Sequence, residues 1–154
     1  MTTDSNSATS PTPKPIPVTI DRISLIMKEF GIDLAIADEQ GTGSQVASAN
    51  LNGHHVMFAV IGSVLIVRAD RATEMPVSDG NPAWHLACNQ VNCFNFAAKA
   101  VVVDRTDNIV IRAEKDVPIA AGLNDIQLSA MLKNAIDHVL AIQDAVANAG
   151  KEIG

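Results

Sequence analysis

The chain has 154 residues, 47% of them hydrophobic but only 3% aromatic, and a net charge of −6 at pH 7. This length fits a single domain whose core is built mainly from Val, Ile, Leu, Ala and Met. The 11 Lys and Arg residues are scattered, whereas nucleic-acid-binding proteins carry a basic stripe that neutralises phosphates, so we expect no nucleic-acid partner.

The N-terminal segment, residues 1–17, is rich in Ser, Thr and Pro and holds hardly any large apolar side chain. Such a segment buries too little surface to offset the entropy of ordering it, which predicts a disordered tail before a single domain over residues 18–150. Two steps, Ser10-Pro11 and Thr12-Pro13, could be phosphorylated, although a solubilising tail is the simpler interpretation. With no signal-like or membrane-spanning apolar run, we expect a cytoplasmic protein without membrane contact.

A first helix is predicted to follow Thr19, whose side chain can accept a hydrogen bond from the first turn. Gly31 stands where a helix commonly ends in a left-handed residue. Between them, apolar residues recur at helical spacing: Ile20, Ile23, Met27 and Phe30.

The next forty residues favour an antiparallel meander of three or four strands. Residues 32–37 alternate between apolar and polar or small side chains, which is typical of a half-buried strand, and Gly41 and Gly43 interrupt them. Asn52-Gly53 is the strongest short hairpin signal, because both residues tolerate positive φ. The further strands are expected over residues 45–51, 54–61 and 64–68.

Residues 70–81 are polar and contain Pro76 and Gly80, which predicts a loop. A second helix is expected to open with Asn81 as N-cap and Pro82 as its first residue, and to end near Phe94. Its apolar stripe is Trp84, Cys88 and Val91, and two strands, residues 97–103 and 108–113, follow it.

The last helix has the clearest start, because Asn124 and Gln127 stand at the two positions of a capping box. Gly150 is expected to end it. Its main apolar face comprises Leu128, Met131, Leu132, Ala135, Ile136, Val139, Leu140 and Val146. The whole pattern predicts an α+β fold: a mostly antiparallel sheet of five to six strands with three helices, in the order α-β(3-4)-α-β-β-α.

Several expected strands are apolar without alternation, including residues 57–61 and 64–67. An antiparallel sheet with one wet face should alternate, so these strands require cover on both faces. The first helix could cover one face and the other two helices the opposite one. Alternatively, a second copy or a partner buries part of a face. We expect a homodimer, since two-fold pairing is the commonest way to bury such a patch.

No residue pattern indicates a catalytic, cofactor-binding or metal site. His85, Cys88 and Cys93 are the one cluster of metal-type residues, but they lack the second ligand pair of a structural zinc site. His54 and His55 are neighbours on a strand and point to opposite faces. We expect Cys88 to be a buried, unreactive thiol. His138, Gly41-Thr42-Gly43, and the acids Asp38, Glu39, Asp104 and Asp107 are interpreted as surface and loop residues.

Three stretches carry a likeness to a known family: Val18–Ile23, the pair of segments Asn89–Asn92 and Lys99–Val102, and Gly122–Leu128, which leads into the last helix. They resemble the YbjN-like family of bacterial proteins. The resemblance implies the fold of the type III secretion chaperones. The family is described as regulating sensory transduction, and the fold implies dimerisation and binding of a protein segment rather than catalysis.

Two functions from different classes therefore remain. The first is a non-enzymatic protein-interaction, chaperone-like or regulatory module whose partner is a segment of another protein. The second is a small-molecule or metal-sensing domain that uses the sheet and the helix of Trp84 as a pocket. The sequence favours the first, because no residues with the spacing of a ligand site support the second.

Overall fold

The computed structural model describes residues 11–38 and 45–153. Within them, three helices accompany one antiparallel sheet of six strands in the order β1-β2-β3-β4-β6-β5. This confirms the predicted α+β class and element order. The elements are α1 (Ile20–Glu29), β1 (Ala35–Asp38), β2 (Gln45–Leu51), β3 (His54–Ile61), β4 (Val64–Pro76), the short 3-10 helix η1 (Val77–Asp79), α2 (Ala83–Phe94), β5 (Lys99–Val103), β6 (Asn108–Pro118) and α3 (Asp125–Ile153).

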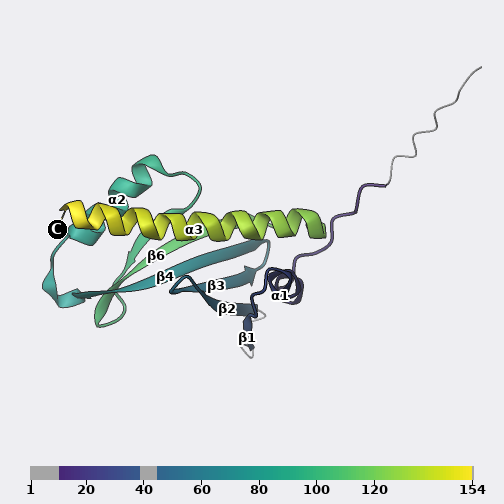
Figure 1. Ribbon diagram of the computed structural model, residues 1–154, viewed down its shortest axis with the longest axis horizontal. Helices are drawn as coiled ribbons and strands as arrows, with labels where there is room; N and C mark the ends of the chain where they lie inside the picture. Colours follow the sequence, from purple (N-terminus) through teal and green to yellow (C-terminus); the bar gives the residue numbers. More distant parts are fainter. Residues whose placement is uncertain (1–10, 39–44, 154) are drawn as a thin grey trace, which may run out of the picture.

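The helices of the described residues all pack on one face of the sheet, which we call the helix face. α3 runs along the sheet, with α1 near its beginning and α2 near its end (Figure 1). Side chains from every second strand position form a single core with the apolar sides of the three helices. The buried strand residues of this core include Val56 and Phe58 of β3, Leu65, Val67 and Ala69 of β4, Ile111, Ala113 and Val117 of β6, and Ala100 of β5.

A buried amide fixes α3 on the helix face. Gln143 is fully buried, and its Nε2 donates to the carbonyl oxygens of Ala69 in β4 and Ile111 in β6, at 2.6 and 2.9 Å. One turn and a half earlier, Lys115 of β6 lies 2.8 Å from the Nδ1 of His138. Because a buried amide without partners costs free energy, these bonds favour one position of α3 on the sheet.

The opposite side of the sheet, the open face, carries the alternate strand residues. Ala59, Ile66 and Met57 lie there and take no part in the core, although Ala59 is only 4% exposed. Within the described residues no helix covers this face. The arrangement with helices on both faces is therefore wrong, and the apolar residues on the open face lack a covering layer.

Strand β4 is much longer than expected. Residues 70–76, predicted as a loop, continue it and pair with β6, with a register shift between Ala72 and Pro76. Their polar side chains find partners across the sheet: Asp70 binds Arg112, and Thr73 donates to the carbonyl of Ile109 at 2.7 Å. Residues 70–76 can therefore form a strand despite their polar composition, because the neighbouring strand β6 supplies hydrogen-bond partners for their side chains.

Other strand boundaries also move. β6 runs to Pro118, five residues past its expected end, because it pairs with β4 over this whole length. β1 begins only at Ala35, and β5 begins at Lys99. β2 and β3 have their predicted bounds, and Asn52 and Gly53 between them have φ values of 50° and 80°, as the hairpin turn requires. The expected break at Gly41 and Gly43 lies outside the described residues.

Two of the three predicted helix starts are confirmed. The hydroxyl of Thr19 accepts from the backbone N–H of Arg22 at 3.2 Å. In α3, the capping box is complete, because Asn124 Oδ1 accepts from the Gln127 N–H at 2.8 Å and Gln127 Oε1 accepts from the Asn124 N–H at 3.0 Å. α2 begins one residue later than predicted, with Pro82 in the cap position, while Asn81 Oδ1 accepts from the Ala83 N–H.

The predicted end of the last helix at Gly150 is wrong, since α3 continues to Ile153. Gly150 instead makes room for the ring of Trp84: a Cβ placed on Gly150 would lie 2.5 Å from the ring atom Cζ3. The glycine therefore marks a close approach of α2 to α3.

Gly150→Ala tests this contact. Alanine is the better helix former by about 1 kcal/mol, so without the ring the substitution would stabilise α3. We expect the opposite, a loss of about 1–3 kcal/mol in the free energy of unfolding, because the methyl group overlaps the ring. Urea denaturation measures this change. In a Trp84→Leu background the same substitution should be neutral or stabilising, and an equal loss in both backgrounds would contradict the contact.

The structure brings the end of the expected tail onto the domain. Ile16 pairs with Leu123 as a β-bridge, with N···O distances of 3.3 and 2.9 Å. Arg22 donates to the carbonyl oxygens of Ile16 and Pro17, both at 2.8 Å. Gly122 permits this approach, with φ +75° and no room for a Cβ, which would lie 2.7 Å from the Ile16 carbonyl oxygen. The folded unit thus extends back to residue 16.

Two truncations separate the parts of the N-terminal segment. Deleting residues 1–10 removes none of these contacts, and the urea midpoint should not change. Deleting residues 1–17 removes two of the acceptors of Arg22 and the bridge partner of Leu123, and we expect a loss of about 1–2 kcal/mol. Equal stability of the two truncated proteins would show that the bridge at Ile16 contributes nothing.

Candidate protein-binding groove

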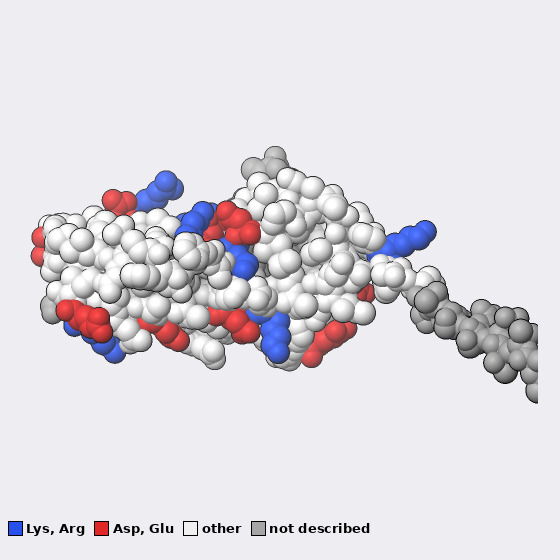
Figure 2. All heavy atoms as spheres, turned by 90° about the horizontal axis from the view of Figure 1, so that it is seen from above, with Lys and Arg blue, Asp and Glu red and all other residues white. Residues whose placement is uncertain are grey.

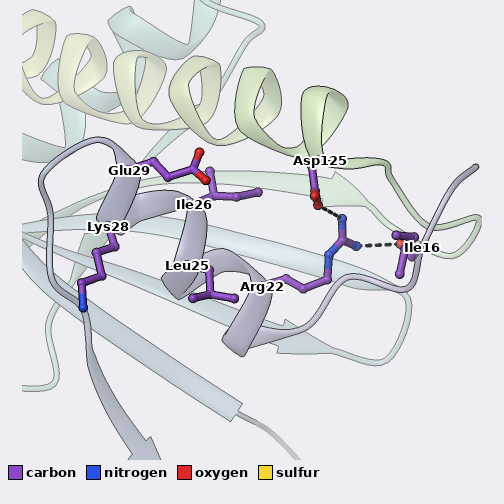
Figure 3. Close-up of a pocket in the computed structure, with 7 residues that line it drawn as sticks. All are labelled: Ile16, Arg22, Leu25, Ile26, Lys28, Glu29 and Asp125. Atoms are coloured by element: carbon purple, nitrogen blue, oxygen red, sulfur yellow. Dashed lines mark hydrogen bonds and ion pairs between the residues drawn. The ribbon is translucent and has the colours of Figure 1, made fainter. Parts of the chain in front are cut away.

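A hollow lies between α1 and the start of α3. It has a volume of about 560 Å³ and combines apolar and charged side chains from both helices and from the N-terminal segment (Figure 3). Two of its apolar residues are strongly exposed, Leu25 at 67% and Ile16 at 48%. The lining residues are Ile16, Arg22, Leu25, Ile26, Lys28, Glu29 and Asp125.

A second hollow of about 390 Å³ continues the first along α3, because both are lined by Glu29 and Asp125. It adds Ile126, which is 74% exposed, and Phe30, which is 41% exposed. We call the two hollows together the α1–α3 groove. The remaining lining residues of the second hollow are Ser129, Ala130 and Lys133.

Arg22 holds the upstream end of the groove in place. Its guanidinium joins α1 to the N-terminal segment, as described above, and donates to Asp125 Oδ1 at 2.8 Å (Figure 3). It also donates to Leu123 O at 2.9 Å. The side chain is only 17% exposed. Four acceptors thus fix one cation that connects α1, α3 and residues 16–17, so this end of the groove is formed before any ligand binds.

The charges around the groove have both signs, with Lys28 and Lys133 against Glu29. Figure 2 shows the molecule of Figure 1 from above: its Lys and Arg side chains (blue) and its Asp and Glu side chains (red) lie in small mixed groups on a mostly uncharged surface. No broad area of one sign is visible on this face of the described residues. Among the described helices, none is long and apolar enough to cross a membrane.

The metal-type residues singled out in the sequence do not converge. Cys88 is buried in α2 while His85 and Cys93 are exposed. His55 is exposed on the open face of the sheet, whereas His54 is half-buried on the helix face. Over residues 11–38 and 45–153, no three His, Cys, Asp or Glu side chains group in a way that could hold a metal ion.

Burial raises the pKa of the Cys88 thiol to about 11, against an opposing effect of the Arg71 charge. The thiol is therefore almost fully protonated near neutral pH, which agrees with the expected unreactive cysteine. Arg71 lies over the ring of Trp84, 5.3 Å from its centroid. The other side of the ring environment is α3, because Trp84 lies against Gly150.

The open face carries a compact charge network. Glu114 is bound by Arg68 and by Lys99, the latter at 2.8 Å, and Lys99 also lies 3.7 Å from Asp116. Burial alone would raise the pKa of Glu114, but the hydrogen bonds from Lys99 and Arg68 outweigh it and lower the pKa below its usual value. Glu114 therefore remains ionised although its side chain is only 10% exposed.

The sequence did not single out the groove. The signal available in the sequence was that two apolar residues, Leu25 and Ile126, lie outside the apolar stripes that predicted their helices. The structure shows that both are exposed. Asn92, which belongs to one of the stretches that resemble the YbjN-like family, has a structural role. Its side-chain amide donates to Ala100 O at 2.9 Å and accepts from Ala100 N at 2.8 Å. It thereby occupies the outer edge of β5 and joins it to α2.

Comparison with known proteins gives a consistent family and fold. Residues 19–148 match the model of the YbjN family, described as "Putative bacterial sensory transduction regulator". The structure is similar to that titled "Crystal structure of YbjN, a putative transcription regulator from E. coli", with a TM-score of 0.63 and 12% sequence identity over 88% of this chain and 96% of that chain. At this identity the likeness concerns the fold alone. No curated protein matches the sequence.

Thiol labelling tests the two cysteines. At pH 8, the exposed Cys93 should react with iodoacetamide at the rate of a free thiol, while Cys88 should react at least a hundredfold more slowly, because it is buried and its pKa is about 11. Peptide mass mapping at several times measures both rates. The Cys93→Ser variant should consequently show almost no fast labelling, and rapid modification of Cys88 in this variant would contradict the burial.

Proposed function

Because the chain belongs to the YbjN family, we propose that it is a non-enzymatic regulatory, chaperone-like module that binds a segment of another protein in the α1–α3 groove. The family description supports a regulatory role. The structural support is the groove itself, in which Ile16, Leu25, Phe30 and Ile126 are all more than 40% exposed. Four large, exposed apolar side chains along one groove are a common sign of an interaction site.

The chemistry of the groove fits an amphipathic segment. Its apolar side chains can contact the apolar side of such a segment, and the rim offers charges of both signs, with Lys28 and Lys133 for acids and Glu29 for bases. The end held by Arg22 is already ordered, so binding loses little entropy there. A partner segment with apolar residues at helical spacing and flanking charges would therefore bind best.

Binding is a better interpretation than catalysis, because the groove lacks a reactive constellation. Its residues include neither cysteine nor histidine, and the carboxylate of Asp125 is held by Arg22. Nucleophilic or acid–base catalysis usually requires a nucleophile beside a base that is itself oriented. The two free cysteines, Cys88 and Cys93, fit the reducing cytoplasm as the compartment of this module.

A peptide library displayed on phage and selected against the full chain tests this function. We expect amphipathic peptides that bind with micromolar dissociation constants and shift the amide NMR signals of residues 22–30 and 125–133. Ile126→Glu should weaken binding at least tenfold. It should not lower stability, because an acid in the first turn of α3 interacts favourably with the helix dipole.

Leu86→Glu is the matched control, since Leu86 is an exposed apolar residue of α2, 50% exposed, outside the groove. This variant should bind the selected peptides like the parent. Peptides that lose affinity with Leu86→Glu but not with Ile126→Glu would contradict the groove as the site. A library without binders would contradict segment binding altogether.

A further inference from the structure

The open face of the sheet is apolar at its centre and half shielded. Val46, Ala59 and Ile66 form a row across β2, β3 and β4, and Met57 lies in the next row. Except for Ala59 these side chains are only half-buried, and at the rim Ile61 and Val101 are 50% and 40% exposed. Because the face is that of a sheet, a flat complementary surface would cover it best.

The charges beside the apolar centre of this face are balanced. Arg68, Lys99 and Arg112 are paired with Glu114, Asp116 and Asp70, so three positive and three negative side chains cancel. The Arg112–Asp70 pair is bidentate, with distances of 2.9 and 2.8 Å. When a face binds a copy of itself, charges of the same sign come close together, so a face with charges of one sign would be repelled by its copy. These three pairs carry no net charge, and each of these ions already has its partner; the one further carboxylate, Glu74, is exposed near the end of β4, away from the apolar centre.

The available area matches a stable interface. With strands of four to thirteen residues, the usual rise of about 3.3 Å per residue and a spacing of about 4.8 Å give the six-stranded face roughly 750 Å². Two such faces in contact would bury about 1,500 Å², within the range of roughly 1,200–2,000 Å² found for specific protein interfaces. The α1–α3 groove alone, between two helices, offers a much narrower surface.

From the balanced charge, the apolar centre and this area we infer that the open face binds the open face of a second copy of the chain. The two sheets pack face to face about 10 Å apart, as in a β-sandwich, around a two-fold axis. Ile66, Met57 and Val46 form the buried centre, and the ion pairs of Arg68 and Arg112 lie beside it. The groove is on the opposite side of each sheet, so each copy keeps a free segment-binding site.

Sedimentation equilibrium of the full chain from 1 to 200 µM, combined with matched substitutions, tests this interface. The parent should have twice the chain mass of 16.2 kDa. Ile66→Lys, which puts an unpaired charge at the centre of the face, should raise the dimer dissociation constant at least a hundredfold, with circular dichroism confirming that the variant is folded. Leu25→Lys, in the groove, should remain dimeric.

A second measurement does not rely on the fold of Ile66→Lys. In a Cys93→Ser background, the thiol introduced by Met57→Cys should react with iodoacetamide at least tenfold more slowly at 200 µM protein than at the dilution where the dimer dissociates. A monomeric mass at every concentration would overturn the inference. So would a dimer that survives Ile66→Lys while the introduced thiol reacts freely, because its interface would lie elsewhere. Neither outcome depends on peptide binding in the groove.

Discussion

The buried amide of Gln143 is the contact on which the arrangement of the molecule depends. It joins the middle of α3 to carbonyl oxygens of two strands that are adjacent only in space, β4 and β6. An apolar helix face alone can slide or rotate on a sheet at little cost, whereas a buried polar group needs its particular partners. With the middle of α3 fixed, its two ends have defined neighbours: Arg22 of α1 contacts Asp125 at the start, and Trp84 of α2 contacts Gly150 near the end.

This placement puts all described helices on one side and determines both candidate surfaces. The groove exists because α1 and the first turns of α3 meet above the edge of the sheet at an opening that their side chains leave unfilled. The open face exists because no described helix remains for it. A protein with helices on both faces would have neither a broad sheet surface nor the same requirement for an external cover.

Hydrogen-bonding side chains at the edges of the fold help to define the groove and the open face. Asn92 satisfies both backbone groups of Ala100 at the outer edge of β5, which blocks the addition of another strand there. Arg22 ties residues 16–17 to the domain at one end of the groove. The family shares this architecture at 12% identity with a solved member, which is physically reasonable because a core requires apolar residues of suitable volume at the right period rather than particular side chains.

The sequence by itself determined the α+β class, the three helices, and features governed by neighbours in the chain. The hairpin at Asn52-Gly53 and the capping box of Asn124 and Gln127 depend on local geometry, so a short segment suffices to predict them. Tertiary structure decided the rest. Residues 70–76 have the composition of a loop and become a strand only because β6 supplies partners for Asp70 and its neighbours.

The difference between local and long-range contacts also explains why the sequence did not predict the contact of Gly150 or the residues of the groove. A glycine near a helix end commonly terminates it, whereas Gly150 lies within α3, and only the ring of Trp84, brought from α2, explains why a glycine stands there. Leu25 and Ile126 are ordinary helix residues in sequence, and they remain exposed beside the hollow where α1 lies against α3. Local signals determine which element forms, whereas long-range packing determines which of its side chains remain available to a partner.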